Sequence, residues 1–268
     1  MISVSTLISM AVAAILGIAV PVVLAWWLVH KYHIRWQTIL IGAGTFIVFA
    51  LLLEPILHQV VLKGPHGAAI TGNVWYYALY GGLAAGIFEE TGRFLSMKFL
   101  MRREPSGALP GVGYGVGHGG IEMLLIFGVT MISNLALAAM INSGQADVLT
   151  AQVPEEQLPQ VQAQFAQLAS LTPGGLLIGL WERLSALVLQ LGLSMLVWTA
   201  VRRSGKWLWL FPAAILLHAL VDGVTVVLAK SVSMVSVEVV LSSIAIAVGA
   251  LGWMLGRKLN AAAEDEQR

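Results

Sequence analysis

The chain has 268 residues, of which 58% are hydrophobic and only 11% are charged. Its mean hydropathy of +0.83 is far above that of soluble proteins, so the composition indicates an integral membrane protein. The absence of cysteine excludes disulfides and thiolate metal sites. A net charge of +1 gives no sign of a nucleic-acid partner.

Apolar runs that are long enough to cross a bilayer, at least ~18 residues each, predict an all-α, polytopic transmembrane helix bundle. The first run has neither a basic segment before it nor a small-residue cleavage site after it, so we expect an uncleaved anchor. We expect one integral membrane domain over 1–268 with about seven spans, or eight if a re-entrant or interfacial helix forms. The runs cover about 5–29, 38–62, 75–98, 111–140, 175–200, 207–229 and 235–256.

The distribution of lysine and arginine between the loops predicts that the N-terminus lies outside and the C-terminus inside. The loops after the odd-numbered spans carry most of the basic residues, whereas the loops after the even-numbered spans hold only Lys63 and Lys230. The longest loop, about 141–174, would be extracytoplasmic, and its glutamine-rich part after Pro159 could form a short interfacial helix. We therefore expect a multi-pass protein of a cell membrane, of the bacterial inner-membrane type. The basic residues that follow the first, third, fifth and seventh spans are Lys31, Arg35, Lys98, Arg102, Arg103, Arg202, Arg203, Lys206, Arg257, Lys258 and Arg268.

Ionisable side chains inside the predicted spans point to a site, because each costs roughly 2.5–3.5 kcal/mol at bilayer depth. Glu89 and Glu90 are adjacent, and Arg93 follows one helical turn later, where its guanidinium can reach either carboxylate. Carboxyl groups outnumber arginines, so we expect protonated carboxyls, charged histidines or a bound cation. The ionisable residues within the spans are Glu54, His58, Glu89, Glu90, Arg93, His118, Glu122, Glu182, Arg183, His218 and Asp222.

Three of these residues fall at one depth. At about 1.5 Å per residue, Glu89, His118 and His218 lie roughly 10–16 Å below the cytoplasmic ends of their helices. We expect the polar pocket to open toward the cytoplasm, past the glycine-rich segment 111–120. Its small side chains would leave room for water.

Helical spacing suggests partners for the two central histidines. His118 and Glu122 are four residues apart, as are His218 and Asp222, so each imidazole has a carboxyl within one turn. A carboxylate on one ring nitrogen fixes the tautomer and raises the basicity of the other. Two further pairs could equally be packing links: Glu54–His58 and Glu182–Arg183.

Three short motifs on separate predicted helices carry a family resemblance. They are Glu89-Glu90-Thr-Gly-Arg93, Tyr114-Gly-Val-Gly-His118 and His218-Ala-Leu-Val-Asp222. The chain resembles the CAAX-protease and bacteriocin-processing superfamily of intramembrane glutamic peptidases, most closely its YhfC-type branch. That superfamily has Glu-Glu-x-x-x-Arg, aromatic-x-x-x-His and His-x-x-x-Asn/Asp motifs. The first motif is one residue shorter here.

The resemblance implies a peptidase for a membrane-embedded or membrane-associated substrate, without a cofactor. Glu89 and His118 would activate a water molecule, and His218 and Asp222 would stabilise the oxyanion. Glu90 and Arg93 would hold Glu89 in place. The expected supporting residues of the site are Tyr114, Glu122, Glu182 and Arg183.

Two alternatives stay open from the residues alone. Glu89, His118 and His218 could bind zinc with an open fourth position. The excess carboxyls could instead bind protons or a cation in a transporter or a non-catalytic membrane scaffold, although the chain has no paired inverted repeat.

Overall fold

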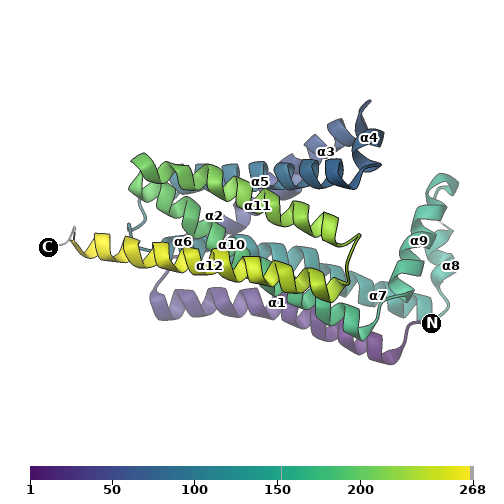
Figure 1. Ribbon diagram of the computed structural model, residues 1–268. Helices are drawn as coiled ribbons and strands as arrows, with labels where there is room; N and C mark the ends of the chain where they lie inside the picture. Colours follow the sequence, from purple (N-terminus) through teal and green to yellow (C-terminus); the bar gives the residue numbers. More distant parts are fainter. Residues whose placement is uncertain (152, 266–268) are drawn as a thin grey trace.

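Long helices that run side by side, alternating in direction, make up the molecule (Figure 1). The computed structural model describes residues 1–151 and 153–265, and this part of the chain contains no strand. The long elements are α1 (Val4–Tyr32), α2 (Trp36–Phe46) continued by α3 (Glu54–Leu62), α5 (Val74–Phe99), α6 (Leu109–Glu122) continued by α7 (Thr130–Asn142), α10 (Pro173–Arg203), α11 (Leu210–Leu228) and α12 (Met234–Asp265). Between them lie α4 (Gly67–Thr71), α8 (Ala146–Thr150), α9 (Leu158–Ala169) and the 3-10 turns Glu155–Gln157 and Gly205–Trp209.

The predicted membrane architecture is confirmed. Within the described residues, 6 helices are long and apolar enough to cross a membrane. Helix α5, which carries Glu89, Glu90 and Arg93, is not among them, but it has 26 residues and lies within the bundle. Together they match the predicted runs within a few residues, except that α12 extends further, to Asp265. Helices suit this setting because a spanning segment must satisfy its backbone hydrogen bonds internally.

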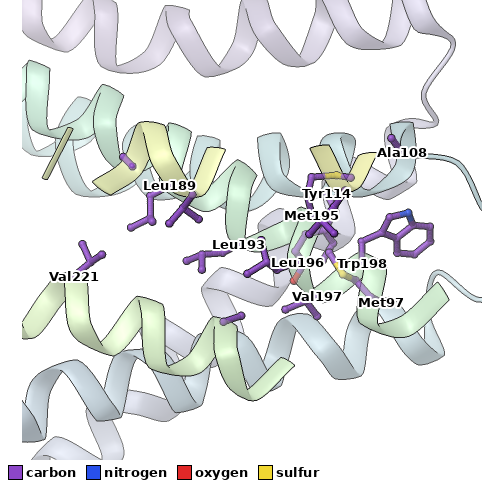
Figure 2. Packing of buried hydrophobic residues seen from close by; sticks show 14 of the residues in the cluster. Met97, Ala108, Tyr114, Leu189, Leu193, Met195, Leu196, Val197, Trp198 and Val221 are labelled. Atoms are coloured by element: carbon purple, nitrogen blue, oxygen red, sulfur yellow. The ribbon is translucent and has the colours of Figure 1, made fainter. Parts of the chain in front are cut away.

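Helix α10 is the centre of the bundle. In its most apolar stretch 72% of the residues are buried, against 17% to 28% for the other candidate spans. Leu193, Val197 and Trp198 of this helix pack with Met97 of α5 and Tyr114 of α6 in the main apolar core (Figure 2). A helix that contacts neighbours on all sides can present polar side chains to several of them at once.

Glycines bring the helices of the polar centre close together. A Cβ atom on Gly86 of α5 would lie 2.6 Å from the carbonyl oxygen of Ile215 in α11. A Cβ atom on Gly117 of α6 would lie 1.9 Å from the carbonyl oxygen of Ile39 in α2. Neither contact is compatible with a larger side chain, so these glycines set the helix separation.

Two π-helical stretches interrupt the spans beside ionisable residues. Ile47–Leu53 precedes Glu54, and Met123–Val129 follows Glu122. Such stretches change the direction of the side chains that follow and are frequent at functional sites. Pro55, which has no backbone N–H, follows Glu54 after the first of them.

The predicted basic loops gather at one end of the bundle. Arg35 Nη1 lies 3.4 Å from Glu104 Oε1, and Arg202 Nη2 donates to the Glu104 carbonyl oxygen at 2.6 Å. Helices α8 and α9 lie at the opposite end, near the N-terminus (Figure 1). The expected helix in the glutamine-rich segment is therefore present as α9. Which end faces the cytoplasm stays a prediction, and Arg268 lies outside the described residues.

Candidate functional site

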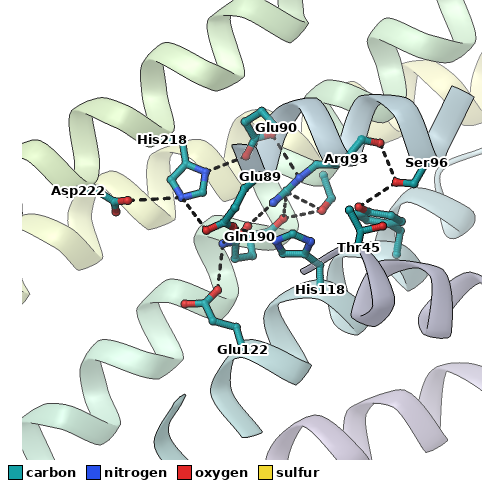
Figure 3. A network of polar contacts seen from close by, with 12 residues as sticks. Thr45, Glu89, Glu90, Arg93, Ser96, His118, Glu122, Gln190, His218 and Asp222 are labelled. Atoms are coloured by element: carbon teal, nitrogen blue, oxygen red, sulfur yellow. Dashed lines mark hydrogen bonds and ion pairs between the residues drawn. The ribbon is translucent and has the colours of Figure 1, made fainter. Parts of the chain in front are cut away.

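Glu89 is the centre of a buried polar network formed by α5, α6, α10 and α11 (Figure 3). Its Oε2 atom lies 2.9 Å from His118 Nε2 and accepts a hydrogen bond from Gln190 Nε2 at 3.0 Å. Its Oε1 atom has no hydrogen bond to any residue that the structure describes; its nearest charged neighbour is His218 Nε2 at 3.9 Å. One oxygen is therefore held, and the other can accept a proton.

His118 is fully buried, and its surroundings indicate its tautomer. The ring lies edge-on to Phe46, with centroids 5.3 Å apart, and stacks on Tyr114 at 5.9 Å. Its Nδ1 atom has no hydrogen-bond partner among the described residues. Because an unsatisfied buried N–H is costly, the proton belongs on Nε2, which donates to the Glu89 carboxylate.

Glu90 and Arg93 form a fully buried ion pair, with Arg93 Nε 3.3 Å from Glu90 Oε2. Arg93 Nη1 also donates to the Gln190 carbonyl oxygen at 2.9 Å and to Ser194 Oγ at 2.8 Å. Arg93 Nη2 donates to Gln190 Oε1. The guanidinium therefore forms its ion pair with Glu90 and not with Glu89, although the spacing along the helix allows either.

His218 faces carboxylates on both sides of its ring. Its Nδ1 atom lies 2.8 Å from Glu90 Oε1. Its Nε2 atom lies 3.7 Å from Asp222 Oδ2 and 3.9 Å from Glu89 Oε1. Glu89, His118 and His218, which the depth argument places at one level, thus meet in one cluster.

Gln190 joins these groups, and the sequence analysis did not identify it. It is 3% exposed, donates from Nε2 to Glu89 and to Glu122, each at 3.0 Å, and accepts from Arg93. A search for ionisable residues omits a neutral amide. The feature that marks Gln190 is its position on the most buried helix. Hydropathy does not predict which helix is most buried, so the sequence carries no usable indication of this residue.

A cavity of about 280 Å³ adjoins the cluster between α10, α11 and α12. Arg183 lies on its wall, donates to Glu122 Oε1 at 3.1 Å and pairs with Glu182. Glu182, Arg183 and Glu122 are therefore connected to Glu89 through Gln190. The polar lining of the cavity is Glu122, Glu182, Arg183, Ser185, Gln190, His218, Asp222 and Thr225.

One expected pairing of the central histidines is wrong, and the other is incomplete. His118 pairs with Glu89 of another helix and not with Glu122, which is engaged by Arg183 and Gln190. The expected neighbour of His218, Asp222, is present at 3.7 Å from Nε2, but the hydrogen-bonded carboxylate of this histidine is Glu90 on another helix. In both cases the shortest contact is with a carboxylate of α5, because a closed bundle brings carboxylates of neighbouring helices within reach.

The glycine-rich start of α6 does not leave room for water. A Cβ atom on Gly115 would lie 3.0 Å from Ser194 Oγ and 3.1 Å from the Leu191 Cα atom. The cavity lies elsewhere: Thr225, on its wall, is close to the end of α11. That end joins α12, so the cavity lies toward the end opposite the basic loops, whereas the sequence predicted an opening at the end that carries them.

The remaining expected pair, Glu54–His58, is a separate cluster. His58 Nε2 lies 3.2 Å from Glu54 Oε1, and its Nδ1 lies 2.8 Å from the Tyr80 hydroxyl. Tyr114, an expected supporting residue, lies in the main network, where its hydroxyl accepts a hydrogen bond from Ser96 at 3.1 Å.

The suggested zinc set of Glu89, His118 and His218 does not fit this arrangement. A histidine that binds metal through one nitrogen normally donates from the other to an acceptor. His118 has no acceptor at Nδ1, and its Nε2 is occupied by Glu89. In the part of the chain that is described, no group of at least 3 histidine or acidic side chains could hold a metal ion.

Comparisons with known proteins agree with a membrane peptidase. The family model of the YhfC intramembrane metalloprotease matches residues 16–244. A curated relative, the uncharacterized membrane protein YhfC of Bacillus subtilis (strain 168), is 38% identical over 224 residues, which are 82% of this chain and 84% of that protein. No solved structure matches. The chain therefore belongs to the YhfC intramembrane metalloprotease family.

Proposed function

We propose that this multi-pass membrane protein hydrolyses a peptide bond of a membrane-embedded or membrane-associated protein, with Glu89 as the general base. The family description supports the class of membrane protease. The observation that supports this mechanism is that only one of the two Glu89 carboxylate oxygens is hydrogen-bonded. Oε2 is held by His118 and Gln190, while Oε1 has no hydrogen bond within the described chain.

In this proposal Glu89 Oε1 takes a proton from water as the water oxygen attacks the scissile carbonyl carbon. A tetrahedral oxyanion forms, the C–N bond breaks, and the proton passes from Glu89 to the departing amine. His118 keeps the base in position by donating from Nε2. The buried Glu90–Arg93 pair anchors the same turn of α5.

The oxyanion would lie at His218 Nε2, which borders the cavity. Because Nδ1 faces the Glu90 carboxylate, which only accepts when ionised, donation from Nε2 to the oxyanion as well requires a ring protonated on both nitrogens. Asp222, 3.7 Å from Nε2, would favour this charge without holding the Nε2 proton in a hydrogen bond. A positioned donor of this kind stabilises charge that appears only in the transition state. This division of roles is that of the CAAX-protease-like glutamic peptidases which the motifs resemble.

The family description refers to a metalloprotease, whereas the His118 environment supports a direct carboxylate–imidazole pair. We therefore propose the glutamic mechanism and derive no step through a metal. A transporter has weaker support, because the chain has no paired inverted repeat and the family description refers to a protease.

The experiment compares membranes from cells that express the wild-type chain or Glu89→Gln. New protein N-termini are labelled chemically and identified by mass spectrometry. We expect cleavage sites that are present with the wild type and absent with Glu89→Gln, which keeps the shape of the side chain but cannot act as the base.

Glu155→Gln serves as the matched control, since Glu155 is exposed in a 3-10 turn far along the chain from the network. It should give the wild-type set of N-termini. Identical sets from the wild type and Glu89→Gln, at equal protein levels, would refute the proposal.

A further inference from the structure

Gln190 lies between the side chains of Glu89, Glu122 and Arg93. The amide group can adopt only one orientation. Its two N–H groups face the Glu89 and Glu122 carboxylates, which are acceptors when ionised, and its oxygen faces the Arg93 guanidinium, which is only a donor. Reversing the amide would place oxygen against two carboxylates and NH₂ against a cation.

Arg93 fixes the backbone beneath this side chain as well as the side chain itself. Its Nη1 atom donates to the Gln190 carbonyl oxygen at 2.9 Å, and Ser194 Oγ, which donates to the same carbonyl at 2.7 Å, receives a second bond from Nη1 at 2.8 Å. Gln190 is 3% exposed, so water does not compete for these contacts. The amide is therefore a rigid group before any substrate is present.

We infer that Gln190 is a positioning residue for the general base, an inference that rests on the proposed function of Glu89. Together with His118 it occupies Glu89 Oε2, so that only Oε1 faces His218, whose ring borders the cavity. Two donors from different helices on one carboxylate oxygen prevent rotation of the carboxylate. Gln190 is not itself placed to contact the reacting atoms through its amide, because all of its polar atoms are already bonded.

The kinetic test uses Gln190→Met and Gln190→Glu with a quenched fluorescent peptide that spans a cleavage site found in the membranes. Gln190→Met keeps the length of the side chain and removes the donor. A hydrogen bond to a charged group implies a fall in kcat of about ten- to hundredfold, with little change in KM. Gln190→Glu adds a negative charge beside Glu89, so the acidic limb of the kcat/KM profile should move to higher pH.

The matched controls are Gln162→Met and Gln162→Glu on the exposed part of α9, which should keep the wild-type kcat and pH profile. A purely structural role of Gln190 would lower the yield or the melting temperature without moving the pH limb. Wild-type kcat and an unmoved pH limb in both Gln190 variants would overturn the inference while leaving the proposed function intact.

A second measurement needs no substrate. Melting temperatures in detergent of Gln190→Met, Glu89→Gln and the double variant form a double-mutant cycle. If Gln190 holds Glu89, the shift of the double variant should differ from the sum of the single shifts. Additive shifts would overturn the inference whether or not the protein cleaves peptides. Non-additive shifts without any hydrolysis by the wild type would refute only the proposed function.

Discussion

Glu89 and Glu90 are neighbours in the sequence, yet their carboxylates face different histidines. Glu89 Oε2 lies 2.9 Å from His118 of α6, and Glu90 Oε1 lies 2.8 Å from His218 of α11. Successive residues of a helix point about 100° apart, so one turn of α5 can reach two neighbouring helices. Each of the adjacent carboxylates thereby makes its short contact with a different histidine, and Glu89 Oε1 approaches His218 only at 3.9 Å.

The bond between His118 and Glu89 predicts a specific kinetic effect. His118→Phe keeps a ring between Phe46 and Tyr114 but removes the donor to Glu89 Oε2. We expect kcat for the cleavage-site peptide to fall about ten- to hundredfold, the value of a hydrogen bond to a charged group. Steady-state kinetics at matched protein concentration measures the change.

The corresponding control is His66→Phe, because His66 is exposed in the segment before α4. It should keep the wild-type kcat. An unchanged kcat in His118→Phe would show that the imidazole does not hold the base.

Helix separation at the site predicts a difference between two adjacent glycines of α5. A Cβ atom on Gly82 would lie 2.3 Å from the Ala219 carbonyl oxygen, whereas one on Gly81 would have nothing within 4 Å. Gly82→Ala should destabilise the protein by about 1–3 kcal/mol, as overpacking does. Gly81→Ala should be neutral or stabilise the helix by up to about 1 kcal/mol.

Thermal unfolding in detergent compares these two variants, and peptide hydrolysis provides a second readout. Displacement of α5 from α11 should also weaken the contact between Glu90 and His218, so Gly82→Ala should lose activity. Equal melting temperatures for the two variants would contradict the close packing of α5 on α11.

Much of this arrangement follows from sequence, and the missing parts have physical causes. Hydropathy predicts the helices because every segment that crosses the bilayer must be apolar and must satisfy its backbone hydrogen bonds internally. The basic loops predict how these helices are oriented. Spacing within a helix predicted the Glu90–Arg93 pair but assigned Glu122 to His118 wrongly. In a closed bundle, partners come from whichever helix is nearest, and that depends on side-chain direction. The two π-helical stretches change the direction of the side chains, and the hydropathy of the spans does not predict them.

Metal dependence separates the proposed mechanism from the family description. Because His118 Nδ1 has no acceptor and its Nε2 is bonded to Glu89, we expect no zinc ligand at this residue. Treatment of the purified protein with a chelator should leave the hydrolysis rate unchanged. Elemental analysis should give well under one zinc per chain. Loss of activity on chelation, restored by zinc but not in His218→Ala, would establish a metal mechanism instead.

The position of the cavity predicts the side from which the site is reached. Thr225 borders the cavity near the end of α11, whereas Gly115 is packed against α10. Because the chain has no cysteine, single cysteines can be introduced at chosen positions and treated with a membrane-impermeant thiol reagent. Thr225→Cys should react from the same face as Gln162→Cys of α9, and Arg103→Cys should react only from the other face.

Right-side-out and inside-out vesicles distinguish the two faces, and the Gln162 and Arg103 variants identify each face independently of the predicted topology. Gly115→Cys should remain unlabelled from both, since a Cβ atom there already lies 3.0 Å from Ser194 Oγ. Labelling of Thr225→Cys from the same face as Arg103→Cys would instead support the opening past the glycine-rich segment 111–120 that the sequence predicted. Labelling together with Gln162→Cys would place substrate access at the end of the bundle where α11 joins α12.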